Sequence, residues 1–197
     1  MKCYRIDITL LEPMLGTAPM DRNVYSTYIA ANAPKPEDGE EEVETINEDK
    51  GKTGFHRKED GSPFLYDYVI KGFFKDAAGM LRRAQGTASA KVTAYKKVID
   101  GMVFVEPRQI TINGEVGVLE RPLRAQTAQG ERVSLASSET VSAGSTLSFD
   151  LIVFEEKTVT LDLLTEWLDY GKWRGLGQWR NAGYGRFTYT ITERAEA

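Results

Sequence analysis

In this chain of 197 residues, some segments repeat apolar residues with the period of a strand and others with the period of a helix. The order of these segments constrains the fold. Apolar residues recur at every second position in 4–10, 147–153 and 187–191, which predicts half-buried strands. They recur with the helical period of 3.6 in 66–84 and 161–168, which predicts two amphipathic helices. The order of strand, helix, several strands, helix and strand predicts an α+β fold of the split β-α-β, ferredoxin-like kind, with insertions.

Between the two helices the sequence predicts short strands. Three stretches, 91–99, 102–107 and 108–120, have a strand-like composition. The last contains Asn113-Gly114, a dipeptide favoured in type I′ turns, which predicts a hairpin at this point.

Two segments interrupt this pattern within a single domain of 1–197. Residues 33–54 are rich in proline, glycine and acids and have no apolar period, so we expect an acidic loop insertion at about 31–60. This insertion either keeps the protein soluble or serves regulation or partner docking. Residues 121–138 are polar, basic and poor in core residues, so we expect an arm at about 113–140.

The composition is that of a folded globular chain. A hydrophobic fraction of 41% and an aromatic fraction of 10% are sufficient for a core. One cysteine excludes an internal disulfide. No apolar run approaches the ~20 residues of a membrane-spanning helix, and the N-terminus has no signal-peptide block. We therefore expect a soluble, cytoplasmic protein with no membrane partner.

The net charge of −4 argues against a nucleic-acid partner, because phosphates attract cationic surface. The distribution of charge reverses this argument. Residues 37–50 hold eight acids and one lysine, whereas 51–132 hold fourteen Lys or Arg and nine Asp or Glu. Residues 171–187 hold four basic residues and no acid. The negative total comes largely from one segment and is compatible with a basic surface elsewhere.

The glycine-rich segment 171–187 reads GKWRGLGQWRNAGYGRF. Its first glycine, Gly171, is expected to end the second helix. The later glycines are expected to take positive φ and to expose N–H groups to an anion. The basic side chains would supply charge to phosphates, and the aromatic side chains would stack on bases or support the loop. The alternative is a long turn whose aromatics fill the core and whose arginines are solvated.

Other chemical motifs are incomplete. The tripeptide GKT at 51–53 resembles the end of a P-loop, but Ile46 stands where the earlier glycine is needed. One histidine and one cysteine make a His/Cys metal site implausible, so no metal and no cofactor are expected. His56 lies in a charged stretch and is expected to be solvated rather than catalytic.

Four segments, in order, resemble the RAMP (repeat-associated mysterious protein) superfamily of CRISPR effector complexes, particularly its backbone subunits. They are the opening strand with LLEPMLGTAPMDRN, then GSPFLYDYVIKGFFKDAAGMLRR, then SSETVSAGSTLSFDLIVFE, and finally GLGQWRNAGYGRFTY. The last is the most specific, because the glycine-rich motif stands directly before the final strand, as in the family.

The resemblance implies an RNA-recognition-like unit that binds single-stranded RNA in antiviral defence, beside copies of itself or other ribonucleoprotein subunits. The basic helix, on which Lys71, Lys75 and Arg82 fall within roughly 40° of one another, and a thumb-like arm would join the glycine-rich loop as RNA contacts. The expected contacts are Lys71, Gly72, Lys75, Arg82, Arg83, Arg121, Arg124, Arg174, Gly175, Gly177, Arg180, Gly183, Gly185 and Arg186.

A non-catalytic binder is the first hypothesis from this resemblance. Some family members cleave target RNA with an aspartate in the loop after the first strand, and Asp21 lies in that region. A metal-dependent ribonuclease that uses Asp21 is therefore one alternative. Another is a stand-alone relative, for instance phage-encoded, that acts by protein docking or inhibition. Its acidic residues 37–49 would then substitute for phosphate against a basic partner.

Overall fold

The computed structural model describes the backbone of residues 1–20, 52–127, 130–154 and 158–194, and the side chains of all of these except 123–127 and 130–135. Asp21, most of the acidic insertion and the side chain of Arg124 lie outside these described parts. No helix within the described ranges is both long and apolar enough to cross a membrane.

The main sheet is antiparallel, and in it β1 (Lys2–Leu10) lies between the edge strand β12 and β11. Its strand order is β12-β1-β11-β8-β6-β5, and β7 also pairs with β11. The other strands are β5 (His56–Arg57), β6 (Pro63–Tyr66), β7 (Val103–Glu106), β8 (Gln109–Asn113), β11 (Thr146–Val153) and β12 (Phe187–Arg194). The predicted alternation in β1 is confirmed, because Tyr4, Ile6, Ile8 and Leu10 are all buried.

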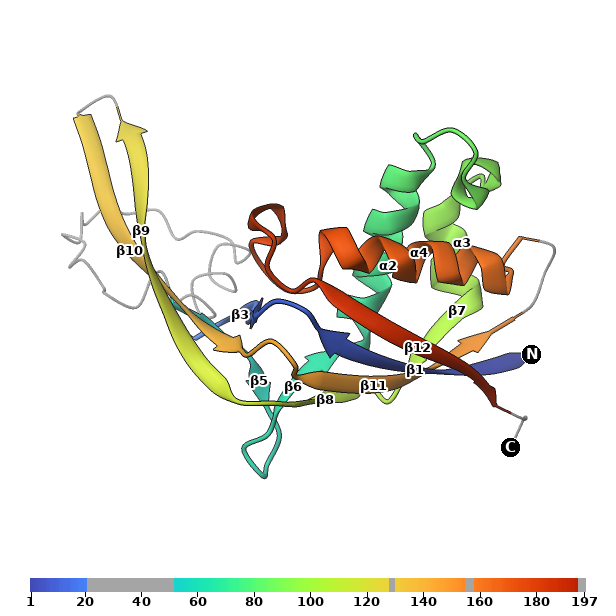
Figure 1. Cartoon of the computed structure of the whole chain (residues 1–197), viewed down its shortest axis with the longest axis horizontal. Helices are drawn as coiled ribbons and strands as arrows, with labels where there is room; N and C mark the ends of the chain where they lie inside the picture. Colours follow the sequence, from blue (N-terminus) through green and yellow to red (C-terminus); the bar gives the residue numbers. More distant parts are fainter. Residues whose placement is uncertain (21–51, 128–129, 155–157, 195–197) are drawn as a thin grey trace, which may run out of the picture.

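Among the described residues, three helices cover one face of this sheet (Figure 1). They are α2 (Asp67–Leu81), α3 (Tyr95–Met102) and α4 (Leu161–Arg174). The predicted stripe of α2 is buried at Ile70, Phe73 and Phe74, and the Phe74 ring lies 5.7 Å from that of Trp167 on α4. Burial of these large apolar side chains between helices and sheet supplies the main stabilisation of the fold.

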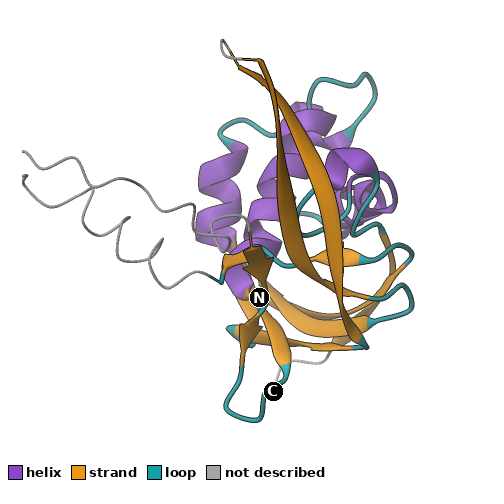
Figure 2. Ribbon diagram, turned by 90° about the vertical axis from the view of Figure 1, so that its left-hand side faces the viewer, coloured by secondary structure: helices purple, strands orange, loops and turns teal. Residues whose placement is uncertain are grey.

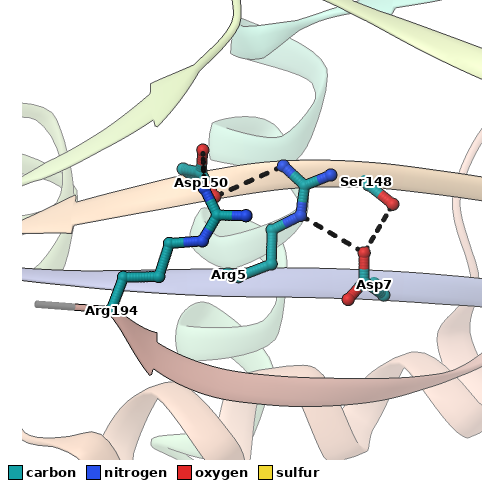
Figure 3. Close-up of polar contacts among 5 residues, drawn as sticks. All are labelled: Arg5, Asp7, Ser148, Asp150 and Arg194. Carbon is teal, nitrogen blue, oxygen red and sulfur yellow. Dashed lines mark hydrogen bonds and ion pairs between the residues drawn. The ribbon is translucent and has the colours of Figure 1, made fainter.

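The opposite face of the sheet is polar and internally charge-paired (Figure 3). On this face Arg5 Nη1 lies 3.3 Å from Asp150 Oδ1, and Arg194 Nη1 lies 3.4 Å from Asp150 Oδ2. Ser148 Oγ donates to Asp7 Oδ1 over 2.6 Å. The cations of this network therefore already have carboxylate partners.

A second sheet carries a long hairpin. Its order is β2-β10-β4-β3, and β9 pairs with β10 in a ladder that runs from Val116↔Val141 to Thr127↔Gly130. The strands are β2 (Met14–Leu15), β3 (Ala18–Pro19), β4 (Lys52–Gly54), β9 (Val116–Thr127) and β10 (Gly130–Val141). The hairpin extends beyond the main sheet and rises on the helical side (Figures 1 and 2). It occupies the region where the sequence predicts an arm.

The expected strand at 91–99 is wrong, because this region is helical. It begins in a 3-10 turn, η2 (Ala88–Lys91), and continues as α3. The apolar residues Tyr95, Val98 and Ile99 have helical spacing as well as strand-like composition, and in the helix they pack against the core. Tertiary packing therefore decides between two structures that local propensity leaves open.

The predicted hairpin at Asn113-Gly114 is also wrong. The strand before it, β8, pairs with β11 and β6, whereas β9 pairs with β10. Neither Asn113 nor Gly114 has the positive φ that a type I′ turn requires. Gly114 is needed for another reason: a Cβ there would lie 1.8 Å from Ser145 Oγ.

The second predicted helix continues one turn past its expected end. Thr160 Oγ1 accepts a hydrogen bond from Leu163 N at the start of α4, and the helix passes through Gly171 to Arg174. A Cβ on Gly171 would lie 2.0 Å from the Phe187 ring, so this glycine permits close packing on β12. The cap is Gly175, with φ of 72°.

Candidate functional site

The glycine-rich loop connects α4 to β12, and its glycines have the conformation that the composition predicts. Positive φ occurs at Gly175, Gly177, Gly183 and Gly185, with values of 72°, 80°, 90° and 71°. A Cβ on Gly185 would lie 1.9 Å from Leu176 O, and one on Gly177 would lie 2.5 Å from Leu15 O. Gly177 and Gly185 are therefore required both for backbone conformation and for space.

The predicted exposure of glycine N–H groups to an anion is wrong for three of these residues. Gly175 N donates to Gly171 O over 3.1 Å, Gly183 N to Arg180 O over 3.0 Å, and Gly185 N to Pro13 O over 2.8 Å. Their N–H groups fix the loop instead of facing solvent, because buried backbone donors need partners. Within the described part of the chain, no hydrogen bond is made by the N–H of Gly177.

Two arginines of this region converge on one carboxylate. Arg174 Nε lies 2.8 Å from Asp76 Oδ2, and Arg180 Nη1 lies 3.0 Å from the same oxygen. Arg174 Nη1 also donates to Asn181 Oδ1. Since one carboxylate carries one negative charge, this trio keeps a net positive charge and holds both guanidinium groups in place.

A hollow of about 660 Å³ lies beside this trio. It is lined by Arg174, Gly177, Gln178, Trp179, Arg180, Asn181 and Ala182. Gln178 N donates to Leu15 O over 3.3 Å, which ties the wall of the hollow to β2. The hollow therefore combines cationic, amide and aromatic groups on a loop that several backbone hydrogen bonds anchor.

The hairpin contributes a further cation through Arg121 of β9. Its guanidinium carbon lies 3.1 Å from the centroid of the Trp179 ring. Arg121 Nε and Nη1 are buried and have no hydrogen-bond partner among the described residues. Burial away from water lowers the pKa of Arg121 below its ordinary value.

Trp179 has an unusual backbone for a bulky residue, with φ of 55° and ψ of 31°. A non-glycine residue in this left-handed region costs about 1–3 kcal/mol, which the surrounding structure must offset. Ala182 N donates to Trp179 O over 2.8 Å at η3 (Arg180–Ala182). The loop thus holds the indole ring, which is 40% exposed, at the rim of the hollow.

The predicted cations on α2 lie apart from the hollow, toward α3. Lys75 Nζ lies 2.6 Å from Asp100 Oδ1, and Lys71 Nζ lies 4.6 Å from the Phe104 ring centroid. Arg82 lies 5.5 Å from the Tyr95 ring centroid. Lys75 and Asp76 are consecutive residues on a helix, so they point about 100° apart. The side chains of Lys71, Lys75 and Arg82 are therefore already engaged with α3 and β7 rather than with the hollow.

The remaining predicted contacts are distributed differently. Arg83 is exposed just after α2, and Gly72 is exposed with no atom within 4 Å of a Cβ placed there. Arg186 Nε donates to Lys172 O over 2.7 Å, and its guanidinium lies 5.2 Å from the Trp173 ring centroid. Of the predicted set, the structure brings Arg121, Arg174, Gly177 and Arg180 to the hollow or its rim.

Sequence reasoning missed Asp76, Gln178 and Asn181. Asp76 follows Lys75 directly on α2, and no local pattern marks it as the partner of arginines about a hundred positions later. The pairing of Arg121 with Trp179 depends on how the hairpin folds back, which sequence spacing does not encode. Within the described residues no three His, Cys, Asp or Glu side chains could hold a metal ion together.

Comparison with known proteins supports the fold at low sequence similarity. No protein-family model matches the chain, and no curated protein matches its sequence. A chain in the cryo-EM structure of the type III-B Cmr-beta bound to cognate target RNA has a similar fold, with a TM-score of 0.58 and 11% identity. The match covers 98% of this chain and spans 60% of the length of that one. This likeness shows a shared mixed α/β fold.

Proposed function

We propose that this protein is a non-catalytic, single-stranded-RNA-binding subunit of the RAMP type in a CRISPR-like ribonucleoprotein. The observation that carries the proposal is the convergence of Arg121, Arg174 and Arg180 around one hollow, from two segments far apart in sequence: β9, and the end of α4 with the loop that follows it. A similar fold occurs in the type III-B Cmr-beta structure with cognate target RNA, which supports RNA as the ligand.

The strand order supports the finer assignment of the fold as ferredoxin-like. The order β12-β1-β11-β7 is antiparallel throughout. One crossover, from β1 to β7, contains α2 and α3, and the other, from β11 to β12, contains α4. Each strand–helix–strand unit is therefore split by another strand, as the fold class requires.

The open face of the sheet is a poor platform for RNA. RNA-recognition domains stack bases on aromatic residues of their central strands. The outward residues of β1, β11 and β12 within the described chain include no aromatic, and Arg5 and Arg194 are already paired with Asp150. The helical side, with the hairpin and the glycine-rich loop, is therefore the proposed RNA-binding side.

In this arrangement the RNA backbone lies along the hollow. Arg174 and Arg180 would contact phosphates with the guanidinium groups that Asp76 pre-orients, because charge-assisted contacts with phosphate are strong and directional. Binding through phosphates carries no sequence information, so the site would accept many sequences.

Fluorescence anisotropy across a salt series tests this proposal with labelled single-stranded RNA, and with DNA of the same sequence for comparison. We expect the logarithm of the affinity to fall linearly with the logarithm of salt concentration, by about 0.7 per phosphate contact. The double variant Arg174→Ala/Arg180→Ala should weaken binding and reduce the slope by about 1.4.

A matched control removes the same charge elsewhere. Lys96 and Lys97 are exposed on α3, away from the hollow. Lys96→Ala/Lys97→Ala should leave most of the affinity and the slope intact. Equal effects of the two double variants would place the binding site away from the hollow, and no salt-sensitive binding of the folded wild-type protein would reject the proposal.

A further inference from the structure

We propose that Arg121 and Trp179 form a closed clasp that single-stranded RNA opens, so that one unpaired base stacks on the Trp179 ring in place of the Arg121 guanidinium. This inference rests on the proposed RNA-binding function. It adds a stacking subsite and a conformational step to a site otherwise described by its phosphate contacts.

The Trp179 ring has one face occupied inside the molecule. The guanidinium carbon of Arg121 lies 3.1 Å from the ring centroid, which is within stacking distance. Tyr184 lies beside the same ring, with centroids 6.3 Å apart and planes at 45°. A guanidinium and a nucleobase are both flat and both stack on indole, so either can occupy this face.

Arg121 is the less satisfied partner in the closed contact. Its Nε and Nη1 have no acceptor within the described part of the chain, and both atoms are buried. A buried donor without a partner opposes the closed arrangement, because water or a ligand would satisfy it. Release from the ring would let the flexible Arg121 side chain donate to an RNA phosphate.

Trp179, by contrast, is held in place. Its backbone keeps a left-handed conformation that few bulky residues adopt, and hydrogen bonds on both sides fix it: Ala182 N to Trp179 O, and Gln178 N to Leu15 O. The expected motion is therefore of Arg121 away from a stationary ring, rather than of the ring.

The chemistry of the subsite defines its ligand. Arg174 and Arg180 lie on the wall of the same hollow, so a base on Trp179 would have its adjacent phosphate near cations. A base in a duplex already stacks on both neighbours, whereas an unpaired base has a face to offer. The subsite should therefore favour single strands that carry bases over a sugar–phosphate backbone without them.

Tryptophan fluorescence tests this inference. The chain has three tryptophans, of which Trp167 is buried and Trp173 is 73% exposed. The substitution Trp173→Phe, made in every protein of this experiment, removes the fluorescence of the exposed Trp173. The probes are a single-stranded oligoribonucleotide and an abasic oligomer of equal length and charge. We expect the oligoribonucleotide to quench Trp179 and to bind roughly tenfold more tightly than the abasic oligomer.

Two variants make the test specific to the clasp. Trp179→Ala should abolish the difference in affinity between the two probes, whereas Trp179→Phe should keep part of it. Arg121→Ala should keep the preference for bases and reduce the salt slope by about 0.7. Circular dichroism checks that each variant remains folded.

The outcomes separate this inference from the function on which it rests. Equal, salt-sensitive binding of both probes, unchanged by Trp179→Ala, would overturn the clasp and leave RNA binding intact. A preference for the oligoribonucleotide that survives in the folded Trp179→Ala variant would place the stacking elsewhere and also overturn it. Failure of both probes to bind the folded wild-type protein would reject both proposals.

Discussion

Arg180 Nη1 lies 3.0 Å from Asp76 Oδ2, which joins the glycine-rich loop to the middle of α2 across 104 positions of sequence. The same oxygen accepts from Arg174 Nε over 2.8 Å. This shared carboxylate explains how an acidic chain gathers arginines at one place without leaving them all unpaired. Asp76 therefore has two effects: it holds the glycine-rich loop against α2, and it lowers the net positive charge beside the hollow.

Replacement of Asp76 by asparagine tests this coupling. Asp76→Asn keeps the shape of the side chain but removes its charge, so we expect the free energy of unfolding to fall by about 1–2 kcal/mol. RNA binding at low salt should become tighter, because the hollow gains one net positive charge. Urea denaturation and anisotropy measure the two effects.

Glu115→Gln is the matched control for that experiment, since Glu115 is exposed between β8 and β9. It makes the same change in net charge away from the hollow and should alter stability and affinity little. Weaker RNA binding by Asp76→Asn would show that orientation of the arginines matters more than their net charge.

A substitution at Gly72 tests whether RNA lies close to the backbone of α2 at this position. Nothing lies within 4 Å of a Cβ placed there, so Gly72→Ala should raise the stability of the free protein by up to about 1 kcal/mol. Gly72 lies one turn before Asp76 on the same side of α2, so we expect RNA affinity to fall as stability rises. Unchanged affinity would remove Gly72 from the RNA contacts.

Gly79→Ala is the contrasting variant in the same helix. A Cβ on Gly79 would lie 2.8 Å from Tyr95 Oη, so the gain in helix propensity should be offset by a clash with α3. Its free energy of unfolding should therefore be lower than that of Gly72→Ala.

Lys75 tests whether the outer face of α2 contributes to binding. Its ammonium group lies 2.6 Å from Asp100 Oδ1, and this partly exposed pair should stabilise the protein by less than about 1 kcal/mol. We expect Lys75→Ala to change RNA affinity and its salt slope less than Arg180→Ala does. An equal or larger loss of affinity in anisotropy measurements would extend the interface to α3.

Tyr189 predicts an alkaline transition. Burial, together with the nearby Asp169 carboxylate, raises the pKa of Tyr189 to about 12. Between about pH 10 and pH 12 the unfolded chain releases the phenol proton of Tyr189, whereas the folded protein keeps it. The contribution of Tyr189 to the free energy of unfolding is therefore complete below about pH 10 and declines as the pH rises toward 12. Tyr189→Phe should remove that part of the decline, measured as the free energy of unfolding against pH.

The parts of the fold with a clear period could be predicted from the sequence. In β1, β11 and β12 alternate side chains enter one core, and in α2 a single stripe is buried, so local pattern and tertiary packing agree. For α3, local pattern and tertiary packing disagree. The β-branched residues Val98 and Ile99 favour a strand, whereas their spacing also suits the helix that packs against the core.

The candidate site was predictable in composition but not in contacts. The glycines and arginines of the loop are visible in sequence, and positive φ follows from glycine chemistry. The partners of these groups, such as Pro13 O for Gly185 N and Asp76 for Arg180, come from distant segments. Only the folded structure shows which donors remain available to a ligand.

The course of β1 has a practical consequence for every experiment above. Cys3 is the chain's single cysteine, is partly exposed, and pairs in register with Arg194 near one end of the strand. The other end meets the glycine-rich loop, where Leu11 N donates to Arg186 O. Cys3 and Leu10 are roughly 23 Å apart along the strand, at 3.3 Å per residue. A thiol-reactive dye or surface linker can therefore be attached at Cys3 without further mutation, on the part of the molecule remote from the ligand.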